Sequence, residues 1–374
     1  MRILALEGYY GGSHRAFLDG WVSRSRHDWT LLTLPPNKWK WRMRHGAFTL
    51  AEQVNARVAQ GESWDAIFCS DMLNLAEFRG LADESVRRLP TVVYFHENQL
   101  TYPVRVENER DYQYAITNFT TALAADAVWF NSAFHRDEFF AALAALFNRM
   151  PDFNPHKQLD SLRAAAEVQP PGIEPFAERP PVRRPGPTRL LWAARWEHDK
   201  NPDDFFAAAE QLLAEGVDFR LSVIGEQFRD APEIFARAKH RFADRIDRWG
   251  YQPSRQDYAE ALAEADIVVS TANHEFFGIG IVEAIAAGAY PLLPRRLAYP
   301  EILNDIETCQ PDEFFYDGTV KHLSESLKTL LLRTGAGTLW QGSPHRGLTA
   351  VTPFFWPARA ASLDAAMESA SPLF

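Results

Sequence analysis

Strand-like and helix-like segments alternate along the whole chain, and this alternation constrains the fold more than any other feature. Short apolar, β-branched runs recur, with stretches of helical periodicity between them. Each strand must then return to its sheet through a crossover helix, which predicts parallel sheets covered by helices on both faces, an α/β fold. We predict strands at residues 3–7, 30–34, 66–69, 91–95, 127–130, 189–193, 219–224, 246–249, 267–270 and 290–293.

A proline-rich stretch divides these strands into two halves. Prolines crowd residues 151–187, and proline both stiffens a chain and interrupts helices. We therefore predict a first Rossmann-like domain at residues 1–172, a linker at 173–187 and a second Rossmann-like domain at 188–352. Residues 353–374 are predicted to form a C-terminal helix that packs back on the first domain. A short helix is also predicted at 160–167, ahead of the linker.

Composition excludes several classes of protein. The 374 residues are 46% hydrophobic, enough for sizeable cores, yet no apolar run approaches the ~20 residues of a membrane span. The chain enters its first strand at once rather than through a signal peptide. The two cysteines, Cys69 and Cys309, lack metal-ligand spacing. A cytoplasmic protein is expected, and a net charge of −10 argues against indiscriminate nucleic-acid binding.

A glycine loop with two glutamates lies between a predicted strand and a predicted helix at 281–287. Glu275 precedes Gly278 and Gly280, and Glu283 follows one turn into the helix. The unpaired amides and positive dipole end of such a helix bind anions, and carboxylates accept hydrogen bonds from diols. These features predict a nucleotide-sugar site. Glutamates also favour the first turn of ordinary helices, so their spacing alone leaves a structural role open.

Two cations follow the first strand of the second half. Arg195 and Lys200 come after the strand at 189–193 and before a helix predicted at 203–214. Open α/β sheets bind ligands at this carboxyl edge. A guanidinium and an ammonium can neutralise a departing diphosphate. Taken alone, the segment fits a solvated loop that pairs Asp199 with Lys200 better than it fits a ligand site.

The first strand of the N-terminal half runs into a glycine loop. Gly11 and Gly12 permit close approach of the backbone to a ligand, and Ser13 is predicted to cap a helix at 15–24. An ordinary tight turn is the structural alternative.

Polar side chains also follow the strand at 91–95. His96, Glu97 and Asn98 crowd its carboxyl end, the favoured place for site residues. Asn131 and Ser132 occupy the corresponding edge of the next strand, with a weaker signal.

The segment at 38–44 alternates cations with large apolar residues. It consists of Lys38, Trp39, Lys40, Trp41, Arg42, Met43 and Arg44. Aromatic rings and cations together suit single-stranded nucleic acid, because rings stack on bases and cations neutralise phosphates. An anionic phospholipid surface would suit the same residues. A strand-like segment with one buried and one solvated face also fits a period of two.

Together, the Arg195/Lys200 and Glu275/Glu283 pairs resemble the signature of retaining glycosyltransferase family 4. That family has the GT-B fold, in which two doubly wound Rossmann-like domains face a cleft. The resemblance covers residues 188–311 and implies that the C-terminal domain binds the nucleotide sugar and the N-terminal domain the acceptor. It assigns the diphosphate to Arg195 and Lys200, the transferred sugar to Glu275 and the ribose to Glu283. Other donor contacts implied in this way are Gly11, Gly12, Phe277, Gly278, Ile279 and Gly280, with His96 on the sugar or the acceptor hydroxyl.

Four segments resemble the tRNA-queuosine mannosyltransferase group more closely: residues 7–14, 38–44, 94–103 and 275–278. Members transfer mannose from GDP-mannose to the cyclopentenediol of queuosine in tRNA-Asp. The resemblance implies that the acceptor RNA, through its anticodon arm, is bound by Lys38, Trp39, Lys40, Trp41, Arg42, Arg44, Glu97 and Asn98. The group includes bacterial members, and the Ala- and Arg-rich composition favours a bacterial origin here.

The expected mechanism is front-face displacement, because no carboxylate nucleophile is apparent. The leaving diphosphate would help to accept the acceptor proton, while Glu275, His96, Arg195 and Lys200 form the catalytic set. No Asp-x-Asp motif is apparent, so we expect neither a metal nor a cofactor beyond the donor. Three alternatives stay open: a lipid or glycan acceptor, a hydrolase or phosphorylase using the same cleft, and a non-catalytic RNA-binding relative.

Overall fold

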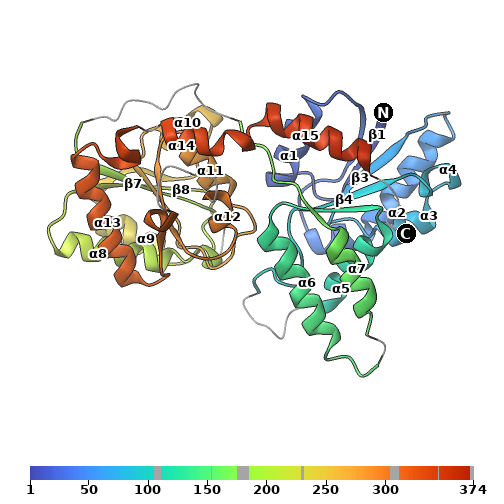
Figure 1. Ribbon diagram of the computed structural model, residues 1–374, viewed down its shortest axis with the longest axis horizontal. Helices are drawn as coiled ribbons and strands as arrows, with labels where there is room; N and C mark the ends of the chain where they lie inside the picture. The colour runs from blue at the N-terminus through green and yellow to red at the C-terminus, as the bar shows by residue number, and fades with distance from the viewer. Residues whose placement is uncertain are drawn as a thin grey trace. The chain divides into compact units, whose positions relative to one another are not determined.

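The computed structural model of the chain describes residues 1–104, 111–152, 154–174, 185–228, 231–303, 311–343 and 345–370. It divides into two compact units (Figure 1). The N-terminal unit comprises Met1–Gly172 and Trp356–Phe374, and the C-terminal unit comprises Ile173–Phe355.

The N-terminal unit is built on a parallel sheet in the order β2-β1-β3-β4-β5-β6. Its strands are β1 (Arg2–Glu7), β2 (Asp28–Thr33), β3 (Ala66–Ser70), β4 (Thr91–Phe95), β5 (Ala127–Phe130) and β6 (Glu167–Val168). Its helices are α1 (Gly12–Val22), α2 (Trp39–Val58), α3 (Leu75–Leu81), α4 (Glu84–Arg87), α5 (Tyr112–Ala124), α6 (Ala133–Phe147), α7 (His156–Ala165) and α15 (Trp356–Ser369).

The C-terminal unit repeats this plan, with the strand order β12-β11-β10-β7-β8-β9. Its strands are β7 (Thr188–Ala193), β8 (Phe219–Ile224), β9 (Ile246–Gly250), β10 (Ile267–Val269), β11 (Tyr290–Pro294) and β12 (Phe315–Tyr316). Its helices are α8 (Pro202–Ala214), α9 (Ile234–Arg241), α10 (Arg255–Ala263), α11 (Ile279–Ala286), α12 (Tyr299–Leu303), α13 (Val320–Gly335) and α14 (His345–Val351). Both sheets are parallel throughout, as the sequence predicts.

Successive side chains of the N-terminal sheet enter two separate cores. On β1, Leu4 and Leu6 join a cluster with residues of α2, α3, α5 and α6, whereas Ile3 and Ala5 join a cluster with α1 and α15. The side-chain period of two in a strand produces this division. Helices therefore cover both faces of the sheet.

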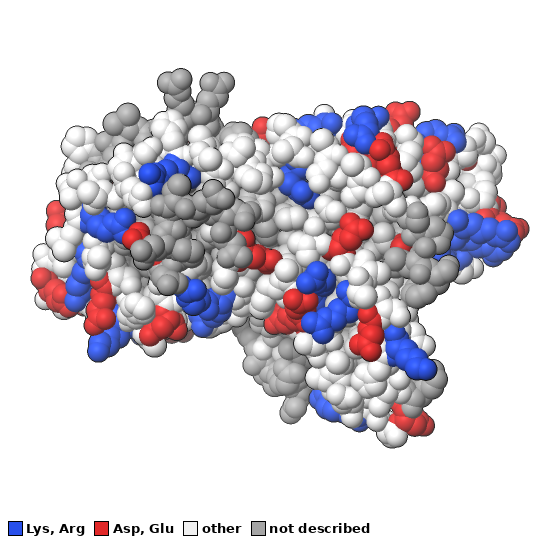
Figure 2. All heavy atoms as spheres, viewed as in Figure 1, with Lys and Arg blue, Asp and Glu red and all other residues white. Residues whose placement is uncertain are grey.

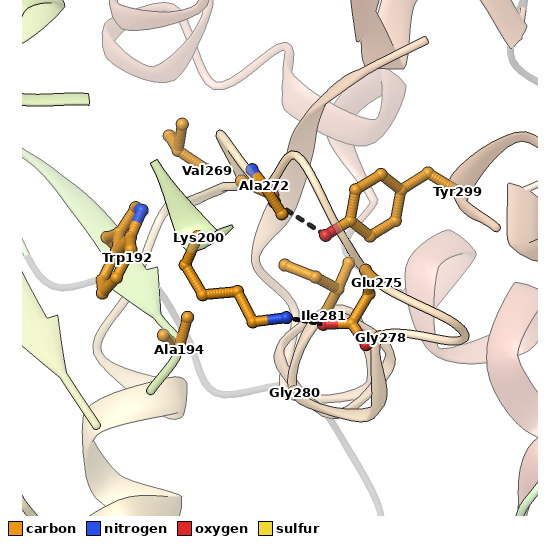
Figure 3. Close-up of a pocket in the computed structure, with 12 residues that line it drawn as sticks. Trp192, Ala194, Lys200, Val269, Ala272, Glu275, Gly278, Gly280, Ile281 and Tyr299 are labelled. Carbon is orange, nitrogen blue, oxygen red and sulfur yellow. Dashed lines mark hydrogen bonds and ion pairs between the residues drawn. The ribbon is translucent and has the colours of Figure 1, made fainter. Parts of the chain in front are cut away.

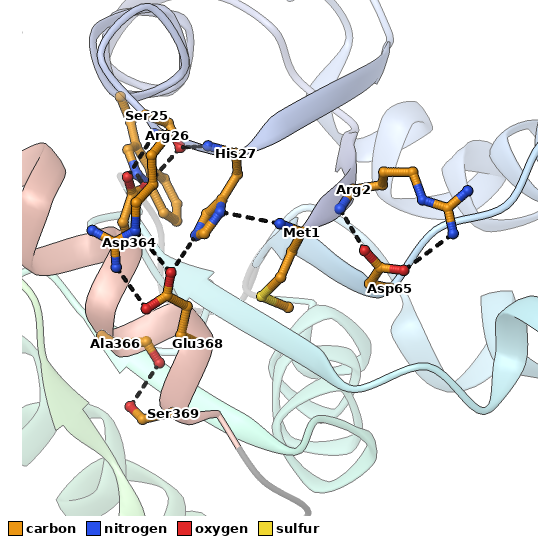
Figure 4. Close-up of polar contacts among 11 residues, drawn as sticks. Met1, Arg2, Ser25, Arg26, His27, Asp65, Asp364, Ala366, Glu368 and Ser369 are labelled. Atoms are coloured by element: carbon orange, nitrogen blue, oxygen red, sulfur yellow. Dashed lines mark hydrogen bonds and ion pairs between the residues drawn. The ribbon is translucent and has the colours of Figure 1, made fainter.

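The C-terminal helix α15 completes one of these cores. It lies against α1 (Figure 1) and contributes Trp356, Leu363 and Met367. Its Asp364 is buried and accepts hydrogen bonds from Trp21 Nε1 at 2.7 Å, Ser25 Oγ at 2.7 Å and Arg26 N at 2.9 Å. Figure 4 shows this cluster beside the Arg26–Glu368 ion pair. The last helix of the chain thus belongs to the first unit.

Several local expectations were wrong. Gly11, not Ser13, precedes α1, so Ser13 lies within the first helical turn. Residues 39–44 are the start of α2 rather than a strand-like segment, because the apolar face from Met43 to Val54 repeats with a helical period. The helix expected at 160–167 is α7, and Glu167 begins β6.

The domain bounds also differ in detail from the expected ones. The C-terminal unit extends to Phe355 rather than residue 352, and Ile173, placed in the linker by the sequence, is buried in its core. Residues 175–184 of that linker and Cys309 lie outside the described residues. Cys69 is buried and unbridged.

The described surface and helices add two points. Lys and Arg are interspersed with Asp and Glu over the face drawn in Figure 2, so neither sign dominates it. Among the residues that the structure describes, none of the helices combines the length and apolar character needed to cross a bilayer.

Candidate active site

The strand order of the C-terminal unit brings its two predicted motifs together. Strand β7 pairs with β10, so the segments that follow them emerge side by side at the same carboxyl edge. One segment carries Lys200 and the other carries Glu275. The structure therefore places two residues 75 positions apart in one site.

Lys200 is the cation of this site, and it is buried. Its Nζ lies 3.3 Å from Glu275 Oε2 (Figure 3). It also donates to the carbonyl oxygen of His274 at 2.7 Å and lies 3.2 Å from Asp199 Oδ2. A buried ammonium is stable only when anions and acceptors surround it. These partners fix the Lys200 amine at the edge of the sheet, where an anionic ligand can meet it.

A cavity lies between Lys200 and the glycine loop. It is lined by Trp192, Ala193, Ala194, Lys200, Val269, Ser270, Ala272, Glu275, Gly278, Gly280, Ile281 and Tyr299. Gly278 has a φ of 98°, in the left-handed region that favours glycine. The space measures about 30 Å³, room for a phosphate oxygen or a water but not for a nucleotide. A larger ligand would have to extend beyond it.

Glu283 lies one turn into α11 and is held by a neighbouring helix. Tyr258 of α10 donates its hydroxyl to Glu283 Oε2 at 2.9 Å. Burial raises the pKa of Glu283 to about 7, although the Tyr258 hydrogen bond and the Arg255 charge oppose the shift. Near neutral pH this carboxyl is therefore divided between its neutral and charged forms.

His274 lies on the other side of Lys200. Burial, followed by the Lys200 charge, lowers the pKa of His274 to about 4. The imidazole is consequently neutral at neutral pH, which leaves Lys200 as the charged cation of the cavity.

The N-terminal unit gathers titratable groups at the corresponding edge of its own sheet. His14 Nδ1 lies 3.2 Å from Glu7 Oε2. The His14 and His96 rings have centroids 4.0 Å apart and are tilted by 33° to each other. The backbone N–H of His96 donates to Asp71 Oδ1 at 2.9 Å. Glu7, His14 and Asp71 are almost fully buried.

The surroundings shift the pKa values of the two histidines in this cluster in opposite directions. Burial alone would lower the pKa of His14, but the charges of Glu7, Asp71 and Glu97 outweigh it and raise the pKa to about 9. Burial, then the positive charges of His14 and His135, hold the pKa of His96 well below its usual value. His14 is thus an imidazolium paired with Glu7, and His96 is a neutral hydrogen-bonding group.

The same cluster has the composition of a metal site. One donor atom each of Glu7, His14 and His96 lies within 4.8 Å of the others. The Glu7–His14 ion pair already satisfies two of these three residues, so a cation would have to displace the His14 proton.

Comparison with known proteins decides the family. Residues 2–173 match a family model described as tRNA-queuosine alpha-mannosyltransferase N-terminal, and residues 175–334 match glycosyl transferases group 1. The chain is 35% identical to the tRNA-queuosine alpha-mannosyltransferase of Drosophila melanogaster over 80% of its length and 81% of the relative's. The chain belongs to the tRNA-queuosine alpha-mannosyltransferase family. It is a glycosyltransferase.

Solved structures support the GT-B fold. Sucrose-phosphate synthase from Thermosynechococcus elongatus matches with a TM-score of 0.73 at 14% identity, over 98% of each chain. Anabaena HepE in complex with UDP-glucose matches with a TM-score of 0.69 at 15% identity, over 99% of this chain and all of the other. At these identities the likeness concerns the fold alone.

The other residues predicted to bind the donor through the C-terminal unit lie in different surroundings. Arg195 is 43% exposed, lies 3.2 Å from Glu197 and does not line the cavity. Phe277 turns its side chain into the core against Phe354, and Ile279 packs against that core. Phe277 and Ile279 could therefore face a donor only through their backbones.

The glycine loop of the N-terminal unit adjoins the segment before α2. A side chain at Gly11 would overlap Pro36, at 2.3 Å, so glycine permits this close approach. Gly12 has a φ of 52° and open space around it. A ligand could thus approach the backbone at Gly12.

The residues after β4 differ in their roles. Asn98 is buried, and its Oδ1 accepts from the N–H groups of Leu100 and Thr101. Glu97 accepts from Gln99 Nε2 at 2.8 Å. The Asn98 side chain therefore shapes the loop and is withdrawn from an acceptor.

Five residues in these two clusters were not predicted from the sequence: His14, Asp71, Asp199, Tyr258 and His274. Asp71 could have been predicted, because it directly follows strand β3 at the edge where ligands bind. Tyr258 gave no sequence signal, because it lies inside a helix and reaches Glu283 only through tertiary packing.

Proposed function

We propose that the protein transfers mannose from GDP-mannose to the cyclopentenediol of queuosine in tRNA, as a retaining enzyme of glycosyltransferase family 4. The observation that carries this proposal is the 35% identity to the Drosophila tRNA-queuosine alpha-mannosyltransferase across both units. Use of GDP-mannose is further supported by a partial relative, the GDP-mannose:cellobiosyl-diphosphopolyprenol alpha-mannosyltransferase of Xanthomonas campestris, 29% identical over 30% of this chain.

The chemistry assigned to the C-terminal unit is stabilisation of the leaving group. The bond between the sugar C1 and the diphosphate oxygen breaks as the acceptor oxygen bonds to C1 on the same face. The acceptor proton passes to the departing phosphate. Lys200 and the amides at Gly278 and Gly280 oppose the charge that develops there, and Arg195 adds a second cation. Glu275 holds the sugar and Glu283 the ribose.

The N-terminal unit supplies the acceptor side. A neutral His96 can exchange hydrogen bonds with a sugar or acceptor hydroxyl without placing a positive charge beside an oxocarbenium-like sugar. The His14 ring, which is paired with Glu7, lies against the His96 ring.

We also propose that the reaction needs neither a metal nor a further cofactor, because Lys200 and Arg195 can supply the positive charge that a divalent ion would bring. A cytoplasmic location follows from a tRNA acceptor. The direct check is the transfer rate after EDTA treatment and after adding Mg²⁺ or Mn²⁺ back. A rate that EDTA abolishes and one of these ions restores would refute metal independence.

The function is tested by incubating the protein with radiolabelled GDP-mannose and tRNA from queuosine-competent or queuosine-deficient cells. We expect label only in the competent tRNA, traced by nucleoside mass spectrometry to queuosine. Label in both would place the sugar on another nucleoside. Absence of label from both would refute the tRNA acceptor and direct the search to lipid or glycan acceptors and other sugar nucleotides.

A further inference from the structure

Helix α2 carries two large aromatic side chains on its solvent side. Trp41 is 59% exposed and Phe48 is 47% exposed. They are seven residues apart, two turns of an α-helix, and therefore lie on one face roughly 10 Å apart along the axis. Surface positions normally show single apolar residues, so an aligned pair of rings is informative.

The histidine between the two rings supports them from below. His45 is buried, and its ring lies 5.0 Å from that of Trp41 and 5.9 Å from that of Phe48. Arg42 Nη1 lies 2.8 Å from His45 Nε2, and Thr49 Oγ1 lies 2.8 Å from Nδ1. Burial and the Arg42 charge lower the pKa of His45, consistent with a neutral ring that accepts from Arg42 and donates to Thr49. The aromatic face is thus held in place.

Exposed cations flank this face at its N-terminal end. Lys38 and Lys40 are exposed, and the first turn of α2 contains no acidic residue. The positive end of the helix dipole adds to their charge. In a chain with a net charge of −10, this is a local reversal of sign.

The other members of the basic segment are engaged within the protein. The Trp39 ring packs 5.1 Å from that of Tyr114, and Arg44 lies 3.1 Å from Asp111. Arg42 also donates to the backbone oxygens of Pro35 and Asn37. Lys40 Nζ lies 5.6 Å from the centroid of the Trp39 ring, and the Lys40 side chain remains exposed. The structure therefore leaves Trp41, Lys38 and Lys40 at the surface, which the sequence pattern could not show.

The start of α2 adjoins the glycine loop of the same unit. Tyr10 N donates to Leu34 O at 2.9 Å, and Pro36 packs against Gly11. The cations consequently lie beside the carboxyl edge of the sheet, where His96 is located.

From this arrangement we propose that Trp41 and Phe48 form a stacking platform for unpaired RNA bases, with Lys38 and Lys40 contacting the adjoining phosphates. Each ring can stack on an unpaired base, and the cations at one end can neutralise phosphates of the same RNA strand. An anionic membrane surface is the alternative occupant of the same rings and cations, and the vesicle measurement below tests it. The platform rests on the proposed function, since it assumes an RNA acceptor.

The test measures binding of a labelled, unstructured oligouridine and of a tRNA transcript by fluorescence anisotropy. For the double substitution Trp41→Ala/Phe48→Ala we expect about tenfold weaker affinity for both, as lost base stacking predicts. Trp41→Tyr/Phe48→Tyr should retain most of the affinity, because its rings still stack. Leu332→Ala, which removes a 77% exposed side chain from the other unit, is the surface control and should bind like the wild type.

Phosphates and lipids are tested separately. Lys38→Ala/Lys40→Ala should weaken binding and reduce its dependence on salt. Vesicles of phosphatidylserine and phosphatidylcholine provide the membrane arm. Unchanged RNA affinity in the double alanine variant would overturn the proposal, as would ring-dependent binding to vesicles but not to RNA.

Transfer assays distinguish this proposal from the enzymatic one. If the wild type binds RNA through the rings but transfers no mannose to tRNA, the proposed reaction fails and the platform stands. If it transfers mannose and the ring substitutions change neither KM for tRNA nor RNA affinity, the platform fails and the reaction stands.

Discussion

The two units place chemically different groups at the same edge of similar sheets. In the C-terminal unit the central charge is Lys200, an ammonium buried between Glu275 and Asp199. In the N-terminal unit the positive charge is carried by His14, which exists only while Glu7 and its neighbours keep the ring protonated. In one site the positive charge belongs to a lysine, and in the other it belongs to a histidine whose pKa is raised to about 9.

This difference indicates how the work is divided. A leaving diphosphate needs a cation under all working conditions, which a lysine supplies. In the proposed reaction His96 is the neutral hydrogen-bonding partner of the acceptor hydroxyl, and burial together with the charge on His14 keeps its pKa low. We expect pH to act on the C-terminal unit through Glu283, whose pKa is about 7, and on the N-terminal unit through His14, whose pKa is about 9.

The largest expected effect comes from removing the permanent charge. Lys200→Ala should lower kcat on the order of a hundredfold, because it removes a charge that stabilises the leaving diphosphate. Glu275→Ala should lower kcat by more than about tenfold, because the sugar loses its carboxylate partner. The measurement is mannose transfer at saturating donor, with circular dichroism to verify folding.

Lys328→Ala is the matched control for Lys200→Ala. Lys328 forms an ion pair with Glu215 on the surface, where such pairs contribute little. Wild-type rates in a folded Lys200→Ala variant would contradict the assignment of the site.

The second effect concerns stability against pH. The pKa of His14 is raised from 6.5 to about 9, so its contribution is complete below pH 6.5 and lost as the pH rises to 9. Burial also raises the pKa of Asp71, and its ionisation therefore costs stability in the same direction as the pH rises. We expect the free energy of unfolding of the N-terminal unit to fall by on the order of 2 kcal/mol across this window.

Denaturant unfolding at pH 6.5 and 9 measures this loss. The His14→Asn variant should lose less unfolding free energy between these two pH values than the wild type does. The control His274→Asn should leave this loss unchanged, because His274 is already neutral throughout this range. An equal pH slope in wild type and His14→Asn would show that the Glu7–His14 pair does not titrate in this way.

A third prediction separates the units by stability. Asp364→Ala should destabilise the N-terminal unit by about 1–3 kcal/mol, because three donors lose their buried acceptor. The C-terminal unit should be unaffected, although α15 follows it in sequence. Hydrogen exchange resolved by peptide measures the two units separately.

Asp203→Ala serves as the control for this substitution, since Asp203 is exposed on α8. Faster exchange spread evenly over both units in Asp364→Ala would argue against assigning α15 to the first.

The smallest effect is expected at Tyr258. Tyr258→Phe removes the hydrogen bond to Glu283 and should raise KM for the donor roughly two- to fivefold with little change in kcat, as for a residue that positions a binding group. Tyr112→Phe in the other unit provides the comparison. If Tyr258→Phe has the same KM for the donor as the wild type throughout pH 6 to 8, the hydrogen bond does not position Glu283.

The sequence predicted the sheets well and the side-chain networks poorly. Buried β-branched runs locate β4, β5 and β8 to the residue, whereas β6 and β12, two residues each, are too short to leave a pattern. The alternation at residues 38–44 resembled a strand because the helical period of α2 becomes visible only over a longer window.

The site was predictable where it depended on strand ends. Lys200 and Glu275 follow paired strands, so their meeting follows from topology. The contacts of His14 with Glu7 and of Tyr258 with Glu283 depend on how helices pack, which local pattern does not specify.

The return of α15 to the N-terminal unit has a consequence for synthesis on the ribosome. The half of the chain that emerges first lacks Trp356, Leu363 and Met367 from one of its cores until α15 has been synthesised. At about 5–20 residues per second, the nascent half waits roughly ten to forty seconds for its final helix. During that interval the face of α1 that receives α15 is open to chaperones, and a truncated product could never close it. Completion of the first domain therefore depends on synthesis of a helix that follows the entire second domain in the sequence.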